Sequence, residues 1–362
     1  MNLKTLAKRV IVAMSGGVDS SVCAWLLKEA GYEPIGVTIK TWGSQECRDE
    51  RSKGCCSIRD IDDARSVARK IGIPYYVMDL SVDFKAKVID TFTEEYLAGR
   101  TPNPCIECNR SIKFGILLEK AKELEASFVA TGHYARKGFH EKQMRHTLYE
   151  AADLSKDQSY VLFGLSQEQL AKTLLPVGEL QKKEVRAIAE KLGLRVFDKP
   201  DSQEICFVKS SYGQFLEDTV SARLPGPGRF VDTKGEAVGM HEGSHLFTIG
   251  QRKRIKITNP EPYFVTGIDA AKNTVIIGRE DDLLKKEMTV RKVNWLSNPR
   301  TGDISVKIRS RHSKTGARII RVDKESVKIQ FNEPQKAVTP GQAAVFYEGN
   351  RVLGGGWIFS AA

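Results

Sequence analysis

The chain has 362 residues and a net charge of +11, from 56 Lys and Arg residues against 45 Asp and Glu residues. This length suffices for two or three domains. No apolar run approaches the ~20 residues of a membrane-spanning helix and no signal peptide opens the sequence, so we expect a cytoplasmic protein with no membrane partner. In that compartment, seven cysteines favour thiol chemistry or metal binding over structural disulfides.

The first chemical motif is a glycine-rich turn between a strand and a helix. Residues 10–13 are apolar and mostly β-branched, as in a buried strand, and a helical pattern runs from Val18 to a stop at Gly31. The Ser-Gly-Gly sequence at 15–17 lets the backbone approach a ligand, and the N–H groups at the helix start favour an anion. The carboxylate of Asp19 would repel a phosphate bound at these N–H groups. It therefore indicates that Mg²⁺ lies between the carboxylate and the phosphate.

This turn lacks the Lys-Ser/Thr of a Walker loop and does not match G-x-G-x-x-G. The sequence Ser-Gly-Gly-Val-Asp-Ser at 15–20 resembles the pyrophosphatase-type loop, or PP-loop, of ATP-dependent AMP-transferring enzymes. We therefore predict an ATP site. The alternative is a glycine-rich connector within an α/β sheet.

Strands and helices alternate over the first half of the chain. We predict strands at 34–39, 74–80 and 128–131, and helices at 57–71, 82–97 and 111–124. This alternation indicates a doubly wound parallel sheet, which binds ligands at the carboxyl ends of its strands. The turn at 15–21 and the Gly132-His133 pair both follow such ends.

Three segments of this half interrupt or follow the pattern. Two prolines in 99–110 predict a rigid loop that displays Cys105 and Cys108. We expect a short apolar strand to carry Cys206. The helical pieces within 165–192 are predicted to place three basic residues on an exposed face: Lys182, Lys183 and Arg186. The polar segment 40–56 contains Cys47, Cys55 and Cys56, whose spacing matches no standard zinc pattern.

From about residue 212, short β-rich runs separated by Gly and Pro turns indicate small barrels. We therefore divide the chain into an α/β PP-loop domain at 1–211, a central β-rich domain at 212–283 and a C-terminal β-barrel domain at 284–362. The last domain holds 15 basic and six acidic residues. Such a basic terminal module indicates a polyanionic partner, most simply a nucleic acid.

Several motifs, in chain order, resemble those of the bacterial tRNA-specific 2-thiouridylase (MnmA/TrmU) family, in a form with a Cys-x-x-Cys. They lie at 15–21, 99–110, 131–134, 156–160, 201–208, 248–253, 339–341 and 352–356. The resemblance implies that ATP adenylates the C2 oxygen of the wobble uridine of tRNA, and that sulfur then displaces AMP. It also implies tRNAs of the lysine, glutamate and glutamine type as substrates, and a sulfur-relay protein or a cysteine desulfurase as partner.

The resemblance also assigns residues to roles. Cys108 matches the catalytic nucleophile, and Cys206 matches the cysteine that receives sulfur as a persulfide. ATP contacts are implied at Ala13, Met14, Ser15, Gly16, Gly17, Val18, Asp19, Ser20, Ile39 and Gly132. Contacts to tRNA, the first three of them around the target base, are implied at Asn103, Pro104, Cys105, His133, Lys156, Asp157, Gln158, Arg311, His312 and Gln342.

Cys105 departs from the family, because many members have Asp at this position. With this third thiol, Cys105, Cys108 and Cys206 could be three ligands of a [4Fe–4S] cluster whose open iron binds the sulfide to be transferred. The alternative is a persulfide carried on one thiol and resolved by another.

Two other functions stay open. One is a PP-loop ligase for a small molecule, of the argininosuccinate or GMP synthetase type; the other is a non-catalytic RNA-binding protein that has kept a nucleotide fold. The basic β-rich tail and the lack of a glutaminase segment count against the ligase. The intact turn at 15–21 and the three thiols count against the second alternative.

Overall fold

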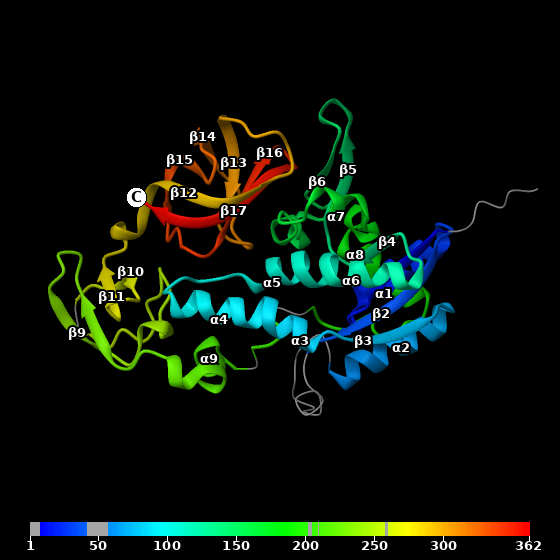
Figure 1. Cartoon of the computed structure of the whole chain (residues 1–362), viewed down its shortest axis with the longest axis horizontal. Helices are drawn as coiled ribbons and strands as arrows, with labels where there is room; N and C mark the ends of the chain where they lie inside the picture. The colour runs from blue at the N-terminus through cyan, green and yellow to red at the C-terminus, as the bar shows by residue number, and fades with distance from the viewer. Residues whose placement is uncertain (1–7, 42–56, 202–204, 209, 258–259) are drawn as a thin grey trace, which may run out of the picture. The chain divides into compact units, whose positions relative to one another are not determined.

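The computed structural model describes residues 8–41, 57–201, 205–208, 210–257 and 260–362 (Figure 1). Contacts within the chain divide it into two compact units. The first unit contains residues 1–88, 105–209 and 350–352, and the second contains residues 89–104, 210–349 and 353–362. All residues predicted to bind ATP, and the three candidate thiols, therefore belong to the first unit.

A five-stranded parallel sheet forms the centre of the first unit, in the order β3-β2-β1-β4-β7. Its strands are β1 (Arg9–Ala13), β2 (Glu33–Lys40), β3 (Tyr75–Asp79), β4 (Phe128–Thr131) and β7 (Thr173–Leu174). The strand order reverses at β1, so the carboxyl ends of β1 and β4 flank the point where doubly wound sheets bind ligands. The predicted parallel α/β fold is confirmed.

Helices α1 (Val18–Glu29), α2 (Ile58–Ile71) and α8 (Lys182–Lys191) pack with β1 and β4 in one apolar core. Val22 on α1, Val67 on α2 and Val185 on α8 are fully or almost fully buried in it. The predicted start of α2 is confirmed, because Ser57 Oγ accepts a hydrogen bond from Asp60 N. The cysteines at 47, 55 and 56 lie outside the described residues.

The predicted loop at 99–110 is wrong beyond residue 103. Helix α5 (Pro104–Glu107) contains Cys105, and a π-helical segment, Cys108–Ile116, continues from it into α6 (Leu117–Ala121). Proline is tolerated at the first position of a helix, where its missing N–H would have had no helical partner. Pro104 therefore starts a helix instead of excluding one.

The remaining elements of the first unit are short. They comprise α3 (Ser81–Phe84), followed by a π-helical segment (Lys85–Ile89), the hairpin of β5 (Arg136–His140) and β6 (Arg145–Tyr149), and α7 (Gln167–Ala171). Arg351 and Val352 pair with β6. The predicted strand around Cys206 is wrong: Cys206 lies in a turn that Val208 N closes by donating to Ile205 O. An apolar run of this length forms a strand only where a neighbouring strand pairs with it.

The second unit contains one helix that we predicted, α4 (Asp90–Leu97), and one that we did not, α9 (Tyr212–Val220). Helix α4 continues the predicted helical region. Helix α9 was not predicted, since we expected helical periodicity to end there. Its N-cap Ser211 accepts from Gln214 N, and Phe215 packs edge-on against Phe92 of α4. Tyr212, Phe215, Leu216 and Val220 recur at the spacing of one helix face, a periodicity that our prediction overlooked, and Leu216 is buried.

The β-rich part of the second unit contains a four-stranded sheet and a barrel. The sheet has the order β10-β11-β8-β9, from β8 (Gly228–Val231), β9 (Ala237–His241), β10 (Phe264–Asp269) and β11 (Thr274–Gly278). The barrel strands are β12 (Leu284–Trp295), β13 (Gly302–Lys307), β14 (Thr315–Val322), β15 (Ser326–Lys336), β16 (Ala343–Glu348) and β17 (Arg351–Ala361).

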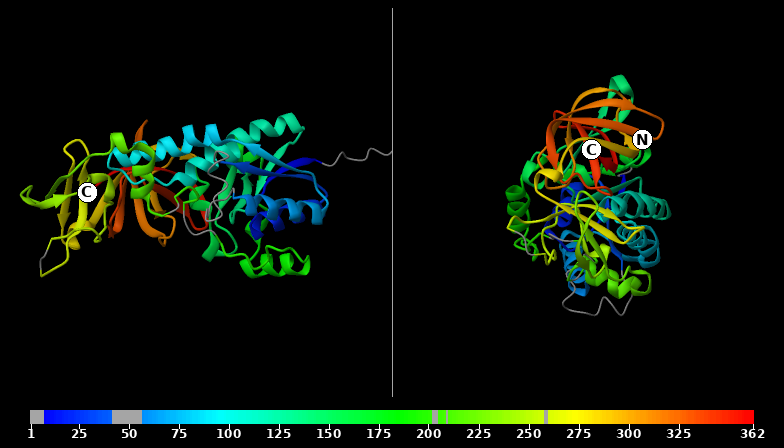
Figure 2. Two further views of the ribbon diagram at one scale, coloured as in Figure 1. Left: turned by 90° about the horizontal axis from the view of Figure 1, so that it is seen from below. Right: turned by 90° about the vertical axis from the view of Figure 1, so that its left-hand side faces the viewer.

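The barrel runs in the order β12-β15-β14-β13-β16-β17 and closes through a β12–β17 pairing. Alternate residues point inward, as in β14, where Ala317 and Ile319 are buried and their neighbours Arg318 and Ile320 are exposed. The orange and red strands in Figures 1 and 2 curve around this core. The predicted barrel-like C-terminal part is confirmed.

Candidate active site

The Ser-Gly-Gly turn joins β1 to α1 as predicted, and its serines fold it back on itself. Ser20 Oγ donates to Gly17 O at 3.1 Å and accepts from Ser15 N at 3.2 Å, while Ser21 Oγ donates to Gly17 O at 2.8 Å. Gly17 is the N-cap of α1 and has no side chain to cap the helix N–H groups. These hydrogen bonds fix the loop while the start of α1 keeps N–H groups that suit an anion.

Gly16 has a conformation and a position that exclude a side chain. Its φ is +70°, and a Cβ built there would lie 2.3 Å from Asp60 O at the start of α2. Close packing of α2 therefore requires glycine at this position, which local sequence pattern alone would not reveal.

We expect Gly16→Ala to lower the affinity for ATP by at least about tenfold, because the loop must shift to relieve the clash. The matched control is Gly31→Ala, at the other end of α1: Gly31 also has a positive φ, +82°, but no atom lies within 4 Å of a Cβ there. The control should lose stability yet bind ATP normally in equilibrium titration. Equal loss of ATP affinity in both variants would contradict this account.

The carboxyl end of β4 reaches the same loop. A Cβ on Gly132 would lie 2.5 Å from Ser20 N, so glycine lets this end of the sheet approach α1. The next residue, His133, is buried, and its Nδ1 lies 2.6 Å from Thr131 Oγ1. Burial, with a smaller effect of Lys113, holds the pKa of His133 well below its ordinary value. The ring is therefore neutral at pH 7.

This burial predicts a loss of stability in acid. Burial also lowers the pKa of His241 and His245 in the second unit. Unfolded histidine binds a proton as the pH falls below about 6.5, whereas these folded histidines do not. The free energy of unfolding should therefore fall below about pH 6.5, by up to about 1.4 kcal/mol per pH unit for each such histidine.

Urea unfolding at pH 7.5, 6.5 and 5.5 measures this dependence. In His133→Gln, the free energy of unfolding should fall less steeply with decreasing pH, by the contribution of one histidine. Stability that stays constant down to pH 5.5 would show that these histidines are protonated in the folded chain.

An ion cluster that the sequence did not predict surrounds Asp19 on the first turn of α1. Lys182 Nζ lies 2.6 and 2.8 Å from the two carboxylate oxygens of Asp19, and Tyr134 OH donates to Oδ1 at 2.8 Å. Lys182 also reaches Asp201 Oδ1 at 2.7 Å. Our prediction that Lys182 lies on an exposed face is wrong: its side chain is only 10% exposed.

Asp201 joins this cluster to the predicted Lys-Asp-Gln motif. Lys156 Nζ lies 2.8 Å from Asp201 Oδ2, and Arg186 Nη2 lies 3.5 Å from Asp201 Oδ1. Burial raises the pKa of Asp201, but its bonds with Lys156 and Lys182 prevail and keep it below the ordinary value. Asp201 is therefore a carboxylate at neutral pH and compensates several cations.

A second lysine, Lys199, also bonds to the loop. Lys199 Nζ donates to Gly16 O at 2.9 Å and to the carboxylates of Asp60 and Asp63 at 2.8 and 2.7 Å. These bonds tie the glycine turn to α2. The partners of Lys199 are more than 130 residues away in sequence, which is why no local pattern indicated its role.

The helical segment that starts at Pro104 places two of the candidate thiols on one face. Ile106, Asn109 and Ile112 are buried, and Asn109 Nδ2 donates to Val161 O at 3.0 Å. Cys105 is exposed and Cys108 is half-buried. Residues three apart are neighbours on a helix surface, so the two thiols lie next to each other along this segment.

Cys206 is half-buried in its turn, and the next residue, Phe207, packs edge-on against Phe84 of α3. Burial raises the pKa of the remaining described thiol, Cys23, far above its ordinary value, so Cys23 is inert. Within the described ranges, no three His, Cys, Asp or Glu side chains form a group that could hold a metal ion. The structure therefore does not bring Cys105, Cys108 and Cys206 together as cluster ligands.

The other predicted tRNA residues of the first unit make internal hydrogen bonds. Asp157 accepts from Ala151 N and from both the N–H and the hydroxyl of Ser159. Gln158 exchanges hydrogen bonds with the backbone of Tyr134, at 2.7 and 3.0 Å. Both residues therefore shape the segment beside the ion cluster.

In the second unit, Gln342 Nε2 donates to Thr101 O at 2.7 Å, and Thr101 N donates to Pro340 O, which fixes the segment before Asn103 and Pro104. Arg311 and His312 are exposed in the turn between β13 and β14. Arg309, at the base of that turn, instead donates to Ala337 O and Thr339 Oγ1.

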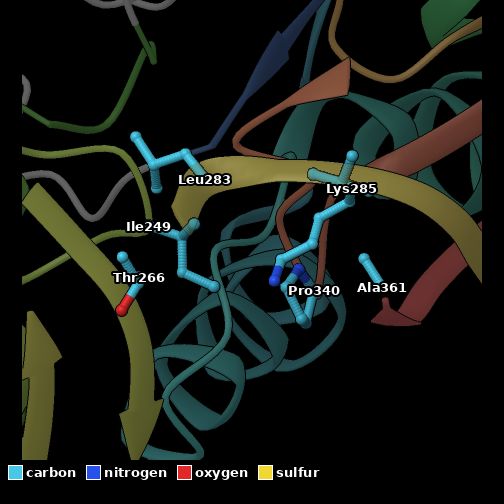
Figure 3. A pocket seen from close by; sticks show the side chains of 7 residues that line it. Ile249, Thr266, Leu283, Lys285, Pro340 and Ala361 are labelled. Atoms are coloured by element: carbon cyan, nitrogen blue, oxygen red, sulfur yellow. The ribbon is translucent and has the colours of Figure 1, made fainter. Parts of the chain in front are cut away.

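The second unit contains a cavity of about 110 Å³ (Figure 3). Thr266 and Lys285 are the polar residues of its lining, which otherwise consists of Ile249, Leu283, Val338, Pro340 and Ala361. No residue with a predicted role lines it, so we do not assign it to the active site.

Known proteins resemble this chain over almost its whole length. The tRNA-specific 2-thiouridylase MnmA of Symbiobacterium thermophilum is 50% identical, covering 98% of this chain and 93% of its own. The protein of the same name from Geotalea uraniireducens is 48% identical, covering 97% and 95%. The chain belongs to the tRNA-specific 2-thiouridylase MnmA family. The resemblance inferred from the motifs is thereby confirmed.

Three family models match this MnmA-family chain in succession. They are described as a tRNA methyl transferase HUP domain at 8–210, a tRNA methyl transferase PRC-barrel domain at 213–279 and an aminomethyltransferase β-barrel domain at 285–358. A solved 4-thiouridine synthetase bound to RNA and ATP is 17% identical over 60% of this chain and 51% of its own, with a TM-score of 0.38, a likeness too weak to bear on fold or function. None of the helices in the described part of the chain has the length and hydropathy of a membrane span.

Proposed function

We propose that this protein catalyses the ATP-dependent 2-thiolation of the wobble uridine of tRNA. The observation that supports this most directly is the location of a pyrophosphatase-type loop and two half-buried thiols, Cys108 and Cys206, on one unit of a chain that belongs to the MnmA family. The basic C-terminal barrel suits the polyanionic substrate.

The loop at 13–20, with Ile39 at the end of β2 and Gly132 at the end of β4, binds ATP in this proposal. The C2 oxygen of uridine is a poor leaving group. It attacks the α-phosphorus of ATP, pyrophosphate departs, and the oxygen becomes part of an AMP group that leaves readily. Helix N–H groups and the dipole of α1 stabilise the phosphate charge.

Mg²⁺ fits the single carboxylate of Asp19 only in company with phosphate, because Mg²⁺ in nucleotide sites takes one or two carboxylates together with phosphate oxygens. When bound, Mg²⁺ would neutralise phosphate charge. Tyr134 orients Asp19 through its hydroxyl, and Ser15, Ser20 and Ser21 hold the loop in shape.

Sulfur transfer uses the two half-buried thiols. The terminal sulfur of a persulfide on Cys206 attacks C2 and AMP leaves. The Cys108 thiolate attacks Sγ of Cys206, which breaks the S–S bond to the transferred sulfur and leaves a Cys108–Cys206 disulfide for a cellular dithiol to reduce. A [4Fe–4S] cluster does not fit the described arrangement of Cys105, Cys108 and Cys206, so no step is assigned to one.

The partners follow from this chemistry. A sulfur-relay protein or cysteine desulfurase supplies the persulfide in the cytoplasm, and tRNAs of the lysine, glutamate and glutamine type supply the uridine. Exposed Arg311 and His312 contact tRNA phosphates. His133, Lys156, Asp157, Gln158 and Gln342 position the segments around the base, as do Asn103, Pro104 and Cys105.

The decisive experiment incubates the protein with ATP, Mg²⁺, a persulfide donor and unmodified tRNA. Thiolated tRNA migrates slowly in a gel that contains organomercury, and we expect it only when ATP is present. Release of pyrophosphate with a small amine acceptor, without thiolated tRNA, would instead identify a PP-loop ligase. Binding of tRNA without either product would identify a non-catalytic RNA-binding protein.

A further inference from the structure

The nucleotide loop has no cation of its own. Residues 13–21 contain neither Lys nor Arg, and they add an acidic residue, Asp19, beside the place proposed for the phosphates. In Walker loops, a lysine within the motif reaches the phosphates. A phosphate site without such a residue needs its positive charge from another part of the fold.

Two lysines from other parts of the fold reach this loop. Lys199 is held by Gly16 O and by two carboxylates of α2, whereas Lys182 contacts Asp19 within the loop itself. Lys182 comes from the first turn of α8, 163 residues beyond Asp19, and its Nζ lies within 2.8 Å of both carboxylate oxygens of Asp19. The side chain is 10% exposed, and Nζ lies 5.6 Å from the centre of the Tyr134 ring. A lysine buried to this extent is stable only with close anionic partners.

The two anions that hold Lys182 differ in their other partners. Asp201 also has Lys156 at 2.8 Å and Arg186 at 3.5 Å, so it stays compensated when Lys182 moves. The ion pairs of Asp19, within the described part of the chain, are with Lys182 alone. These five residues comprise three cations and two anions, and Asp153, which accepts from Lys182 N, adds a third anion beside them.

We propose that Lys182 supplies the charge that the loop lacks, by exchanging Asp19 for the β- and γ-phosphate oxygens of bound ATP. In the nucleotide-free loop, Lys182 neutralises Asp19 and keeps it oriented. When a divalent cation accompanies ATP and takes the Asp19 carboxylate, Lys182 keeps Asp201 as a partner, and the phosphates replace Asp19 as its second anion. This inference rests on the proposed ATP site but not on which molecule receives the AMP group.

The test measures binding of ATP and AMP, each with Mg²⁺, by calorimetry on the full chain. Lys182→Met should weaken ATP binding about 10- to 100-fold, since it removes a charge-assisted contact with the terminal phosphates, and should change AMP binding less than about threefold. Lys183→Met is the matched control, because Lys183 is the next residue on α8 and is exposed; it should bind both nucleotides normally.

Lys182→Gln and Lys182→Arg keep the test valid if methionine disturbs folding, which thermal unfolding reports. Glutamine can still donate to Asp19 but has no charge, so it should behave as methionine does, whereas arginine should retain most ATP affinity. Equal loss of ATP and AMP affinity, or no loss of either, would overturn the proposal and leave Lys182 as a structural ion pair.

The two proposals can fail separately. Wild-type protein that binds ATP but thiolates no tRNA would refute the proposed function and leave the role of Lys182 intact. Lys182→Met protein with normal ATP affinity would refute the role of Lys182 and leave the function intact.

Discussion

Replacement of Cys206 by serine should reduce the yield of thiolated tRNA at least about 100-fold while ATP-dependent activation of the tRNA continues. A serine hydroxyl cannot carry a persulfide, so no sulfur reaches C2. Adenylation does not need the thiol, because the C2 oxygen is the nucleophile in that step. The variant should therefore release about one pyrophosphate per tRNA and then stop, with normal tRNA affinity.

Cys23→Ala is the matched control, since Cys23 is the buried thiol whose raised pKa makes it inert. This variant should thiolate tRNA at close to the wild-type rate, whereas Cys108→Ser should match Cys206→Ser. Organomercury gels report the product, and a coupled phosphate assay reports pyrophosphate. If Cys206→Ser still thiolates tRNA, Cys206 has no role in the mechanism. If the variant loses both thiolation and pyrophosphate release, the substitution disturbs the nucleotide site.

The features that the sequence predicted well depend on local chemistry. The strand at 10–13, the glycine turn and α1 follow from side-chain size and backbone freedom within some 20 residues, and the start of α2 follows from one Ser-to-Asp spacing. The alternation of these elements was enough to predict a parallel sheet. The barrel strands were likewise predictable, because inward and outward residues alternate over each of them.

The wrong predictions concern segments whose local sequence is compatible with two different structures. Proline can exclude a helix or start one, and the choice at Pro104 depends on burial of Ile106, Asn109 and Ile112 behind it. The apolar residues around Cys206 could form a strand only beside a neighbouring strand, and no strand in the described part of the chain pairs with them. Neither outcome can be read from the segment itself.

The ion cluster shows a different limit. Lys182 lies beside Lys183 in a polar stretch typical of a solvated helix face, yet it is buried against Asp19 across the fold. Its partners are 163 and 19 residues away, so their proximity exists only after the sheet has assembled. The division into three domains remains a prediction from the change to β-rich sequence, and the ATP and tRNA contacts remain predictions from the family resemblance.

The second large effect concerns salt. We expect the affinity for tRNA to fall at least about 100-fold between 50 and 200 mM salt, because lysines and arginines that neutralise several phosphates release counterions on binding. The barrel region at 284–362 holds nine of the eleven excess positive charges. A logarithmic plot of affinity against salt concentration measures the number of phosphate contacts as its slope.

Charge removed from the two ends of the barrel should then have unequal effects. Arg311 is exposed in the β13–β14 turn, and Lys324 is exposed in the β14–β15 turn. Successive turns of an antiparallel barrel lie at opposite ends, so the two variants remove one charge each from different places. Arg311→Ala should lower the salt slope by about one and weaken binding, while Lys324→Ala should leave the slope unchanged. Equal salt slopes for Arg311→Ala and Lys324→Ala would mean that tRNA affinity depends on the overall charge of the barrel and not on a defined contact at the β13–β14 turn.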